Sequence, residues 1–222
     1  MKRKEIYLTI DDAPSKDFEE KREFLRKNKI PAIFFCRGSY AENRKEQLIS
    51  AIKEGFLIGN HSYNHPHFSS IDLKQAGKEI EKTDRLIEEL YALAKIKRKY
   101  KLFRFPYGDK GGKIKDEIQN ILKAKDYEQP DFKVKLSWMK EHDSNKDVDV
   151  LWTLDYQEWN SKTSIEDINK KMSDKNPEKG GNLYDLNFPE VFLIHDHNGT
   201  KEKFFFILNK LIEMNIKFVS LN

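Results

Sequence analysis

Five of the six histidines of this chain lie in two short segments. His61 and His65 are four residues apart, and His195 and His197 flank a single aspartate. One helical turn would place His61 and His65 on the same face with Cβ atoms about 5–6 Å apart, but Pro66 disfavours helical geometry at His65 and favours a tight turn. Two imidazoles at this spacing can share a metal ion, although the same spacing also occurs where histidines have no metal role.

A pair of adjacent aspartates, Asp11 and Asp12, directly follows the apolar run 5–10, which we expect to be a strand. Neighbouring residues of a strand point to opposite faces, so the two carboxylates can converge only where the backbone turns, and Pro14 supplies a turn. Converging carboxylates raise one another's pKa unless a cation neutralises them. The pair is therefore either part of a cation site or a solvated acidic turn before a helix that begins at Asp17.

Three more groups of polar residues stand at the ends of expected strands. Arg104 begins the segment Arg-Phe-Pro-Tyr-Gly, where its guanidinium could hold a carboxylate through two hydrogen bonds. Asp155, Glu158 and Trp159 follow the run 148–154, and His195 ends the run 191–195. Five strand ends with chemically capable side chains favour one convergent site over five coincidences.

Apolar runs alternate along the chain with amphipathic stretches. The pattern predicts strands at residues 5–10, 31–36, 56–59, 102–105, 131–136, 148–154, 191–195 and 217–221, and helices at 17–28, 43–54, 72–94, 114–124, 164–172 and 201–214. Such alternation is typical of a mostly parallel sheet covered by helices, either a barrel or an open doubly wound sheet. In both architectures the functional residues collect at the carboxyl ends of the strands.

The composition indicates a folded chain without a strongly charged surface. Charged residues make up 35% and hydrophobic residues 38% of the 222 residues, a mixture that approaches the disordered class. The 15 Phe, 9 Tyr and 3 Trp argue for a packed core, because disordered chains are poor in aromatic residues. The net charge of +4 is spread along the chain and argues against nucleic-acid binding.

The single cysteine, Cys36, excludes an intramolecular disulfide and a cysteine-based zinc site, and its apolar surroundings predict a buried thiol. No apolar run approaches the roughly 20 residues of a membrane-spanning helix. The first residues also lack the apolar stretch of about 7–15 residues that marks a signal peptide. If Met1 is the native start, we expect a cytoplasmic protein.

In this order, the five polar segments resemble the motifs of the polysaccharide deacetylase family, which is also called carbohydrate esterase family 4 or the nodulation-type deacetylase homology domain. The family patterns TFDDGP, H[ST]xxH, RxPYG, DxxDW and LxHD correspond to residues 9–14, 61–65, 104–108, 155–159 and 193–196, and the resemblance extends over residues 5–221. Ala13 replaces the usual glycine, Ile10 replaces phenylalanine, and Glu158 replaces the second aspartate of the fourth motif. The segment between Gly108 and Asp155 is longer than is usual in the family and could reshape the substrate groove.

The resemblance implies an α/β fold, a distorted (β/α) barrel of roughly seven strands that forms a single domain over residues 1–222. It implies one divalent metal ion held by Asp12, His61 and His65. Zinc is expected first, with cobalt, nickel or manganese as alternatives. Asp11 would be the general base, and Arg104 would hold it.

On the other side of the implied site, His195 would be the general acid, with Asp155 as its carboxylate partner. Tyr107 would offer its backbone N–H to the oxyanion, and Trp159 and Leu193 would line the acetyl pocket. A base that must be ionised and an acid that must be protonated predict a bell-shaped pH–rate profile.

The implied activity is a metal-dependent hydrolysis that removes N-acetyl groups from N-acetylated sugars, whether polysaccharides, oligosaccharides or a glycan precursor. The motifs leave open O-acetyl ester hydrolysis or small-molecule amide hydrolysis on the same scaffold, because these reactions share the catalytic residues. They also leave open a catalytically silent carbohydrate-binding homologue, for which Glu158 is the one hint. A carbohydrate is the expected partner, and neither a nucleic acid nor a membrane is expected. The sugar and the oligomeric state stay undetermined.

Overall fold

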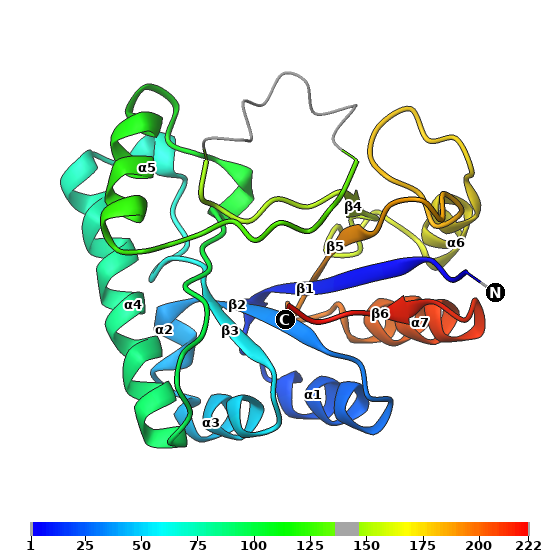
Figure 1. Ribbon diagram of the computed structural model, residues 1–222, viewed down its shortest axis with the longest axis horizontal. Coiled ribbons are helices and arrows are strands. Elements are labelled where there is room, and N and C mark those ends of the chain that lie inside the picture. The colour runs from blue at the N-terminus through cyan, green and yellow to red at the C-terminus, as the bar shows by residue number, and fades with distance from the viewer. Residues whose placement is uncertain (1, 136–146, 222) are drawn as a thin grey trace.

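Six strands form one parallel sheet in the computed structural model, which describes residues 2–135 and 147–221. The strands are β1 (Glu5–Ala13), β2 (Ala32–Cys36), β3 (Leu57–Asn60), β4 (Leu154–Asp155), β5 (Glu190–His195) and β6 (Lys217–Phe218). Their order is β3-β2-β1-β5-β4, and β6 pairs with the beginning of β1. Figure 1 shows β1 and β2 in the middle of the molecule, with helices on the outside.

Backbone hydrogen bonds extend this sheet into a closed ring. Beyond β3, Asn60 forms a parallel bridge with Phe103, and Val150 N donates to Phe103 O at 2.7 Å. The same segment then reaches β5, because Thr153 N donates to Val191 O at 2.8 Å and β4 pairs with β5. The pairing of β5 with β1 completes the circuit. The fold is therefore a distorted (β/α) barrel, which confirms the predicted fold class.

All six predicted helices are present around the ring, together with one short helix, α2, that was not predicted. The helices are α1 (Phe18–Lys27), α2 (Gly38–Ala41), α3 (Lys45–Lys53), α4 (Leu73–Ala94), α5 (Lys115–Ala124), α6 (Ile165–Ser173) and α7 (Lys201–Glu213), with 3₁₀ turns η1 (Phe68–Ser70), η2 (Pro106–Gly108) and η3 (Gly112–Ile114). Side-chain caps fix two of their starts. The Asp72 carboxylate accepts from Gln75 N before α4, and Ser164 and Asp167 form a capping box before α6.

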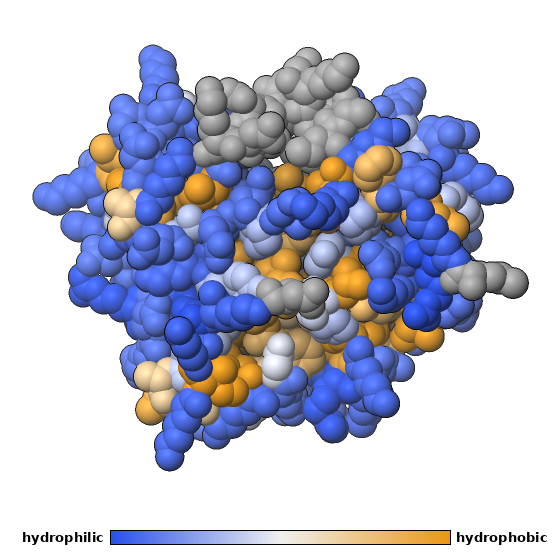
Figure 2. Space-filling model, in the orientation of Figure 1, coloured by the Kyte–Doolittle hydropathy of each residue, from blue (hydrophilic) through white to orange (hydrophobic). Residues whose placement is uncertain are grey.

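The strands are buried on both faces, as a parallel sheet covered by helices requires. All five residues of β2 are buried, and one large apolar cluster joins β1, β2 and β5 to α1, α3, α4 and α7. Cys36 is a buried free thiol, as predicted. Figure 2 shows a mostly hydrophilic face with hydrophobic residues gathered near its centre. In the described ranges, none of the helices combines the length and the apolar character that crossing a membrane needs.

Two expected strands are shorter than predicted, because side chains take the backbone groups that a strand ladder would use. Residues 102–105 contribute only the bridge at Phe103, and the run 148–154 reaches strand geometry only in β4. Arg104 donates from Nε to Val150 O at 3.1 Å and from Nη2 to Leu151 O at 2.9 Å. Leu151 N in turn donates to Gln129 Oε1. These contacts replace regular pairing in this part of the ring.

The expected strand 131–136 is not observed over residues 131–135, while Leu136 lies outside the described residues. Lys133 has a φ of 56°, and its N–H donates to Asp131 Oδ1 at 3.1 Å, so the backbone turns at this point. The last expected strand, 217–221, is reduced to β6, after which Val219 N still donates to Ile6 O.

Candidate active site

The carboxyl ends of the strands surround a cavity of about 270 Å³. Its wall contains nine of the ten predicted site residues, namely Asp11, Asp12, His61, His65, Tyr107, Asp155, Trp159, Leu193 and His195. The tenth, Arg104, is 1% exposed and lies behind Asp11. A larger cavity of about 800 Å³ opens at the amino ends of the strands, beside Tyr7 and Phe56, and contains none of these residues. The chemistry predicted from the strand ends is therefore gathered in the smaller cavity.

Asp12, His61 and His65 form a compact cluster, in which one ligand atom of each lies within 4.8 Å of the others. Nε2 of His65 is 3.1 Å and Nε2 of His61 is 3.9 Å from Asp12 Oδ1. Nδ1 of His61 lies 2.8 Å from Arg104 O, and a carbonyl can only accept, so Nδ1 carries the proton and Nε2 keeps its lone pair toward the cluster. Burial lowers the pKa of His61, which favours the neutral imidazole that a metal requires.

The carboxylate of Asp12 completes the fit to a cation. Its Oδ1 is buried and has no hydrogen-bond donor in suitable geometry among the described residues, which is costly without a cation. Burial acts to raise the pKa of Asp12, but the imidazoles of His65 and His61 outweigh it and hold the pKa well below its usual range. Three protein ligands of this type leave coordination positions for water and substrate, as catalytic sites do. The cluster therefore fits one divalent metal ion.

The backbone at these ligands adopts left-handed conformations that residues other than glycine rarely use. The φ angle is 65° at Asp12, 62° at Ser62 and 62° at His65. At Asp12 this conformation coincides with a shift in the β1–β2 register and brings its carboxylate into the same cavity as that of Asp11. The sequence prediction that Pro14 supplies this turn is corrected: the backbone already turns within β1. Residues 61–65 are not helical, as predicted from Pro66, and the chain bends at Tyr63 and Asn64 between the two histidines.

Asp11 and Arg104 form a buried ion pair beside the cluster. Arg104 Nη1 donates to Asp11 Oδ1 at 2.9 Å and to Thr9 Oγ1 at 2.8 Å, and its guanidinium carbon lies 4.4 Å from the centre of the Phe35 ring. The second oxygen of Asp11, Oδ2, is 3.6 Å from His61 Nε2. Asp11 is therefore held by one oxygen and directs the other toward the metal cluster.

Asp11 and His195 are direct register partners across β1 and β5, so these two groups lie side by side. Glu158 Oε1 accepts from His195 N at 2.6 Å and lies 2.9 Å from His195 Nδ1. Burial lowers the pKa of His195, but the hydrogen bond and the charge of Glu158, helped by Asp11 and Asp12, outweigh it and raise the pKa to about 9. The imidazole is therefore protonated at neutral pH.

Asp155, predicted as the carboxylate partner of His195, does not make this hydrogen bond, so the predicted pairing is wrong. Asp155 Oδ1 accepts from Gln157 N at 2.7 Å, and burial, together with the charge of Glu158, raises the pKa of Asp155. Gln157 has a φ of 57°, and the chain turns there before Glu158. The residue that departs from the family motif is the one that reaches His195, while Asp155 stays on the cavity wall.

Aromatic side chains form the outer part of the cavity wall. Tyr107 is 63% and Trp159 47% exposed, whereas Leu193 is buried. The Tyr107 ring stacks on His67 with 3.9 Å between ring centres, and it meets His65 edge-on at 4.5 Å. Exposed rings beside a few polar groups are typical of a ligand-binding cavity.

A chain of hydrogen bonds fixes the turn that carries the two histidine ligands. Asn60 Oδ1 accepts from Ser62 N at 2.9 Å, and Ser62 Oγ accepts from His65 N at 3.0 Å. Asn60 is fully buried, and its own backbone N and O bond to residues 102 and 104 of the neighbouring segment. Asn60 therefore connects the turn that carries the histidines to the neighbouring segment 102–104.

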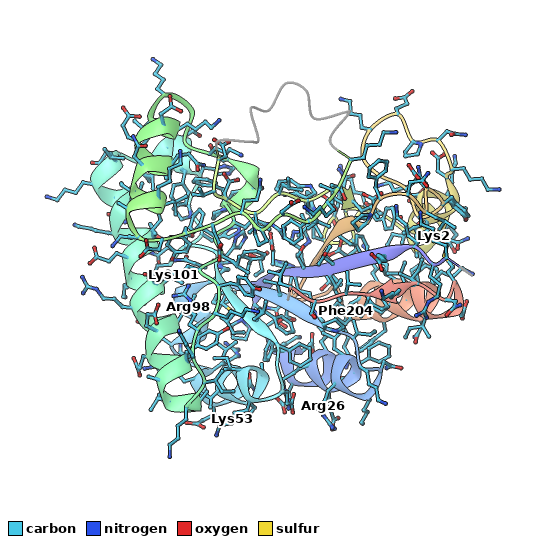
Figure 3. The ribbon with its side chains drawn as sticks, in the orientation of Figure 1. Lys2, Arg26, Lys53, Arg98, Lys101 and Phe204 are labelled. Carbon is cyan, nitrogen blue, oxygen red and sulfur yellow. The ribbon has the colours of Figure 1, made fainter. Side chains whose placement is uncertain are left out.

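Behind Asn60 the network continues to α4 and to the segment that follows α5. Asn60 Nδ2 donates to Tyr127 OH at 2.7 Å, and Tyr127 OH donates to Asp84 Oδ1 at 2.9 Å. Arg98 and Lys101, which Figure 3 labels beside α4, pair with the two oxygens of Asp84 at 2.7 and 3.3 Å. The ligand turn is thus connected to a buried charge network that none of the five motifs indicated.

Sequence reasoning missed four residues of this site. Glu158 enters the sequence analysis only as a departure from a motif, and His197 only as a neighbour of His195. Arg37, Trp152 and His197 all line the cavity. Arg37 directly follows β2, so the strand-end rule could have found it. Trp152 packs against Gly108, because a Cβ at residue 108 would lie only 2.7 Å from the Trp152 ring. No sequence pattern indicated this contact.

Known proteins are similar to this chain in both sequence and fold. The family profile described as "Polysaccharide deacetylase" matches residues 1–130. Peptidoglycan-N-acetylmuramic acid deacetylase PdaC of Bacillus subtilis (strain 168) is 30% identical over 175 residues, which are 77% of this chain and 31% of the relative. Chitooligosaccharide deacetylase of Sinorhizobium fredii (strain NBRC 101917 / NGR234) is 29% identical over 104 residues, which are 46% of each protein. The chain thus spans less than half the length of these curated relatives.

A solved structure of peptidoglycan deacetylase PdaC from Bacillus subtilis is similar to the whole chain. It has a TM-score of 0.68 and 27% sequence identity, and the similarity covers 99% of this chain and 88% of that chain. The matching family profile spans more than half of the 222 residues and includes Asp11, Asp12, His61, His65 and Arg104. The chain belongs to the polysaccharide deacetylase family.

Proposed function

We propose that this protein, acting as one catalytic domain over residues 1–222, is a metal-dependent hydrolase that removes N-acetyl groups from N-acetylated sugars. The observation that carries the proposal is the convergence of three elements in one cavity: the metal cluster, the Asp11–Arg104 pair and the His195–Glu158 pair. The names of the relatives describe deacetylases of peptidoglycan and of chitooligosaccharides, which supports an N-acetylated glycan as the substrate class.

Asp12, His61 and His65 would hold the ion, which we take to be zinc, with cobalt, nickel or manganese as alternatives that depend on availability. A bound divalent ion of this kind lowers the pKa of water and polarises a carbonyl oxygen. The cluster lies next to Asp11, whose Oδ2 faces His61 Nε2 at 3.6 Å. Water and an acetamide carbonyl would therefore meet beside a carboxylate that can accept a proton.

In the proposed reaction Asp11 removes the proton of the attacking water, while Arg104 keeps the carboxylate oriented. His195 gives its proton to the departing amine nitrogen, which is a poor leaving group until it is protonated. Glu158 stabilises the imidazolium and fixes the ring through Nδ1, so Nε2 is the nitrogen that donates. The register pairing of β1 with β5 places this base and this acid on neighbouring strands.

The remaining predicted residues would position the substrate. We propose that the backbone N–H of Tyr107 faces the oxyanion and that Trp159 and Leu193 flank the acetyl methyl group. All three line the cavity, and the exposed rings of Tyr107 and Trp159 offer apolar surfaces to a sugar.

Acetate release tests the proposal. The protein would be assayed on a panel of N-acetylated and O-acetylated oligosaccharides, after chelation and again after addition of Zn²⁺, Co²⁺, Ni²⁺ or Mn²⁺. We expect metal-dependent release from N-acetylated substrates, and an Asp11→Asn variant that retains the ion serves as the control. Release from O-acetylated sugars alone would identify an esterase instead. Sugar binding without release by the metal-loaded protein would identify a silent binding protein.

A further inference from the structure

Arg37 lines the catalytic cavity without an anionic partner in the protein. Among the described residues, no carboxylate oxygen lies within 4.0 Å of its guanidinium, and its buried Nε has no hydrogen-bond acceptor. The guanidinium of Arg37 lies over the ring of Tyr40, with 4.2 Å between the guanidinium carbon and the ring centre. By contrast, Arg98 and Arg104 pair with Asp84 and Asp11 at 2.7 and 2.9 Å. Arg37 is therefore an available cation in this cavity.

The backbone around Arg37 is rigid. Arg37 N donates to Ala13 O at 2.9 Å, and its carbonyl accepts from Tyr40 N at 3.1 Å. The next residue, Gly38, donates to Ser62 O at 2.9 Å and packs so closely that a Cβ there would lie 2.4 Å from the ring of Tyr63. The side chain thus starts from a fixed point beside the end of β1, which carries Asp12, and beside the turn after β3, which carries the histidine ligands.

Asp155 on the cavity wall accepts from Gln157 N and has no cationic partner among the described residues, but the charges of Asp11 and His195 are already matched. Arg104 neutralises Asp11, and Glu158 neutralises protonated His195. Asp12 would be neutralised by the bound ion. A guanidinium without such a partner on a fixed backbone is suited to bind an anion of the ligand, because it offers a planar fork of donors to a carboxylate or a phosphate.

Resting on the proposed function, we infer that Arg37 is a specificity-determining residue that binds an anionic substituent of the N-acetylated sugar. A carboxylate, for example on a lactyl ether at O3, and a phosphate at O6 share the chemistry that Arg37 recognises. The substrate class is then an acidic N-acetylated glycan rather than a neutral one.

Three matched oligosaccharides of N-acetylglucosamine test the inference. One is unsubstituted, one carries a 3-O-lactyl carboxylate on the reacting sugar, and one carries a 6-phosphate there. The zinc-loaded protein is assayed for kcat/KM on each, as wild type and as Arg37→Gln, Arg37→Lys and Arg44→Gln. Arg44 is the matched control, because it lies just before α3 and does not line the cavity.

We expect the wild type to prefer one of the two anionic oligosaccharides to the neutral one, and the preferred anion identifies the source of the charge. Arg37→Gln should lower the anionic-to-neutral ratio of kcat/KM by about 10- to 100-fold, as expected for a hydrogen bond to a charged group. Arg37→Lys should lower it less, since the charge remains without the planar fork, and it decides the question if Arg37→Gln does not fold. Arg44→Gln should keep the wild-type ratio.

The inference is overturned if the wild type prefers neither anion, or if Arg37→Gln and Arg37→Lys keep the wild-type ratio. Dissociation constants of the same three oligosaccharides, measured by calorimetry on the zinc-loaded proteins, separate this result from a failure of the proposed function. If no acetate is released from any of them, the proposed function fails. The anionic-to-neutral ratio of the dissociation constants then decides alone whether Arg37 selects an anion.

Discussion

The site has two halves that are built on different kinds of backbone. The base half consists of the metal cluster with Asp11 and Arg104, and the acid half consists of His195 and Glu158. Asp11 and Asp12 lie near the end of β1, and His61 and His65 follow β3; these are parallel strands of nine and four residues. His195 ends a regular strand, but its partner Glu158 comes from the loop after β4, a strand of only two residues. The predicted pair Asp11–Arg104 is present, whereas the predicted pair Asp155–His195 is not. Register fixes neighbours in the first half, and in the second half a turn decides which carboxylate reaches the imidazole.

The two halves also differ in how completely their polar atoms are satisfied. Arg104 is 1% exposed, and its nitrogens donate to four acceptors, two of them backbone carbonyls. Glu158 Oε1 serves both His195 N and Nδ1, while Oε2 is buried without a hydrogen-bond partner in the described ranges. The base is therefore positioned redundantly, and the acid depends on a single carboxylate oxygen.

Removing a metal ligand should have the largest effect, because it abolishes the chemistry that both halves serve. His61→Ala and His65→Ala should lose stoichiometric metal and lower kcat/KM by more than about 10³-fold, since a bound ion contributes several kilocalories per mole to such reactions. Metal analysis and acetate release measure the two effects. His67→Ala is the control for the metal content alone, because His67 is an exposed residue outside the ligand cluster but stacks on Tyr107. Full metal content in both ligand variants would overturn the assignment.

Asp11→Asn should separate chemistry from metal binding in the base half. The variant removes the proton acceptor but leaves Asp12, His61 and His65 in place, so it should retain the ion and lose about 10²–10⁴-fold in kcat. Metal analysis and turnover are measured on the same preparation. Near-normal turnover would remove Asp11 from the mechanism.

Glu158→Gln tests the acid half through the pH dependence of kcat/KM. The pKa of His195 is raised to about 9, so the imidazolium is present below that pH and is lost as the pH rises through it. A bound cation beside Asp12 offsets part of this rise, because it repels the imidazolium. Without the Glu158 charge the pKa falls, and the alkaline limb should move to lower pH, with a loss that grows with pH up to about 10²–10⁴-fold.

Asp155→Asn is the matched comparison for Glu158→Gln, because Asp155 lines the same cavity without bonding to the imidazole. Its alkaline limb should shift less than that of Glu158→Gln. If Asp155→Asn moves the limb and Glu158→Gln does not, the pairing first predicted from the sequence would be correct in solution.

Tyr127→Phe should give the smallest effect, since it acts on the ligand turn only through Asn60. The variant leaves Asn60 Nδ2 without one of its two acceptors and should lower the free energy of unfolding by about 1–3 kcal/mol. Metal affinity should fall by less than the roughly 10–100-fold typical of residues that hold a ligand directly. Chemical denaturation and metal titration measure both, with Tyr184→Phe as the control, because Tyr184 is 40% exposed. An unchanged unfolding free energy would show that the network does not support the turn.

The parts of the fold that sequence reasoning predicted are those in which local pattern and tertiary structure agree. The amphipathic period of α4 and the apolar runs of β2 and β5 are each sufficient to identify the element. Residues 102–105 and 148–154 carry equally apolar runs. Their strand pairing is interrupted by the Arg104 side chain, a long-range contact that no local pattern encodes.

The residues of the candidate site also fall into a part that the sequence predicts and a part that depends on tertiary structure. Residue types and strand ends indicated that Asp12, His61, His65 and His195 would converge, but their roles came from the family resemblance. Glu158 was not predicted as the partner of His195, because its position depends on the left-handed turn at Gln157. Spacing along the chain is identical whether this turn exists or not, so only three-dimensional structure could distinguish the two carboxylates.

The part of the barrel between Asn60 and Val150, which residues 102–104 bridge without forming a regular strand, has a dynamic consequence. Few backbone bonds hold this part, so local opening there costs less than opening between β1 and β2. Amide hydrogen exchange should accordingly be faster at Val150 than in the middle of β1. Arg104 donates to the carbonyls of Val150 and Leu151 and also to the carboxylate of Asp11. Each transient opening at Val150 would therefore release Asp11, the proposed general base, from its alignment.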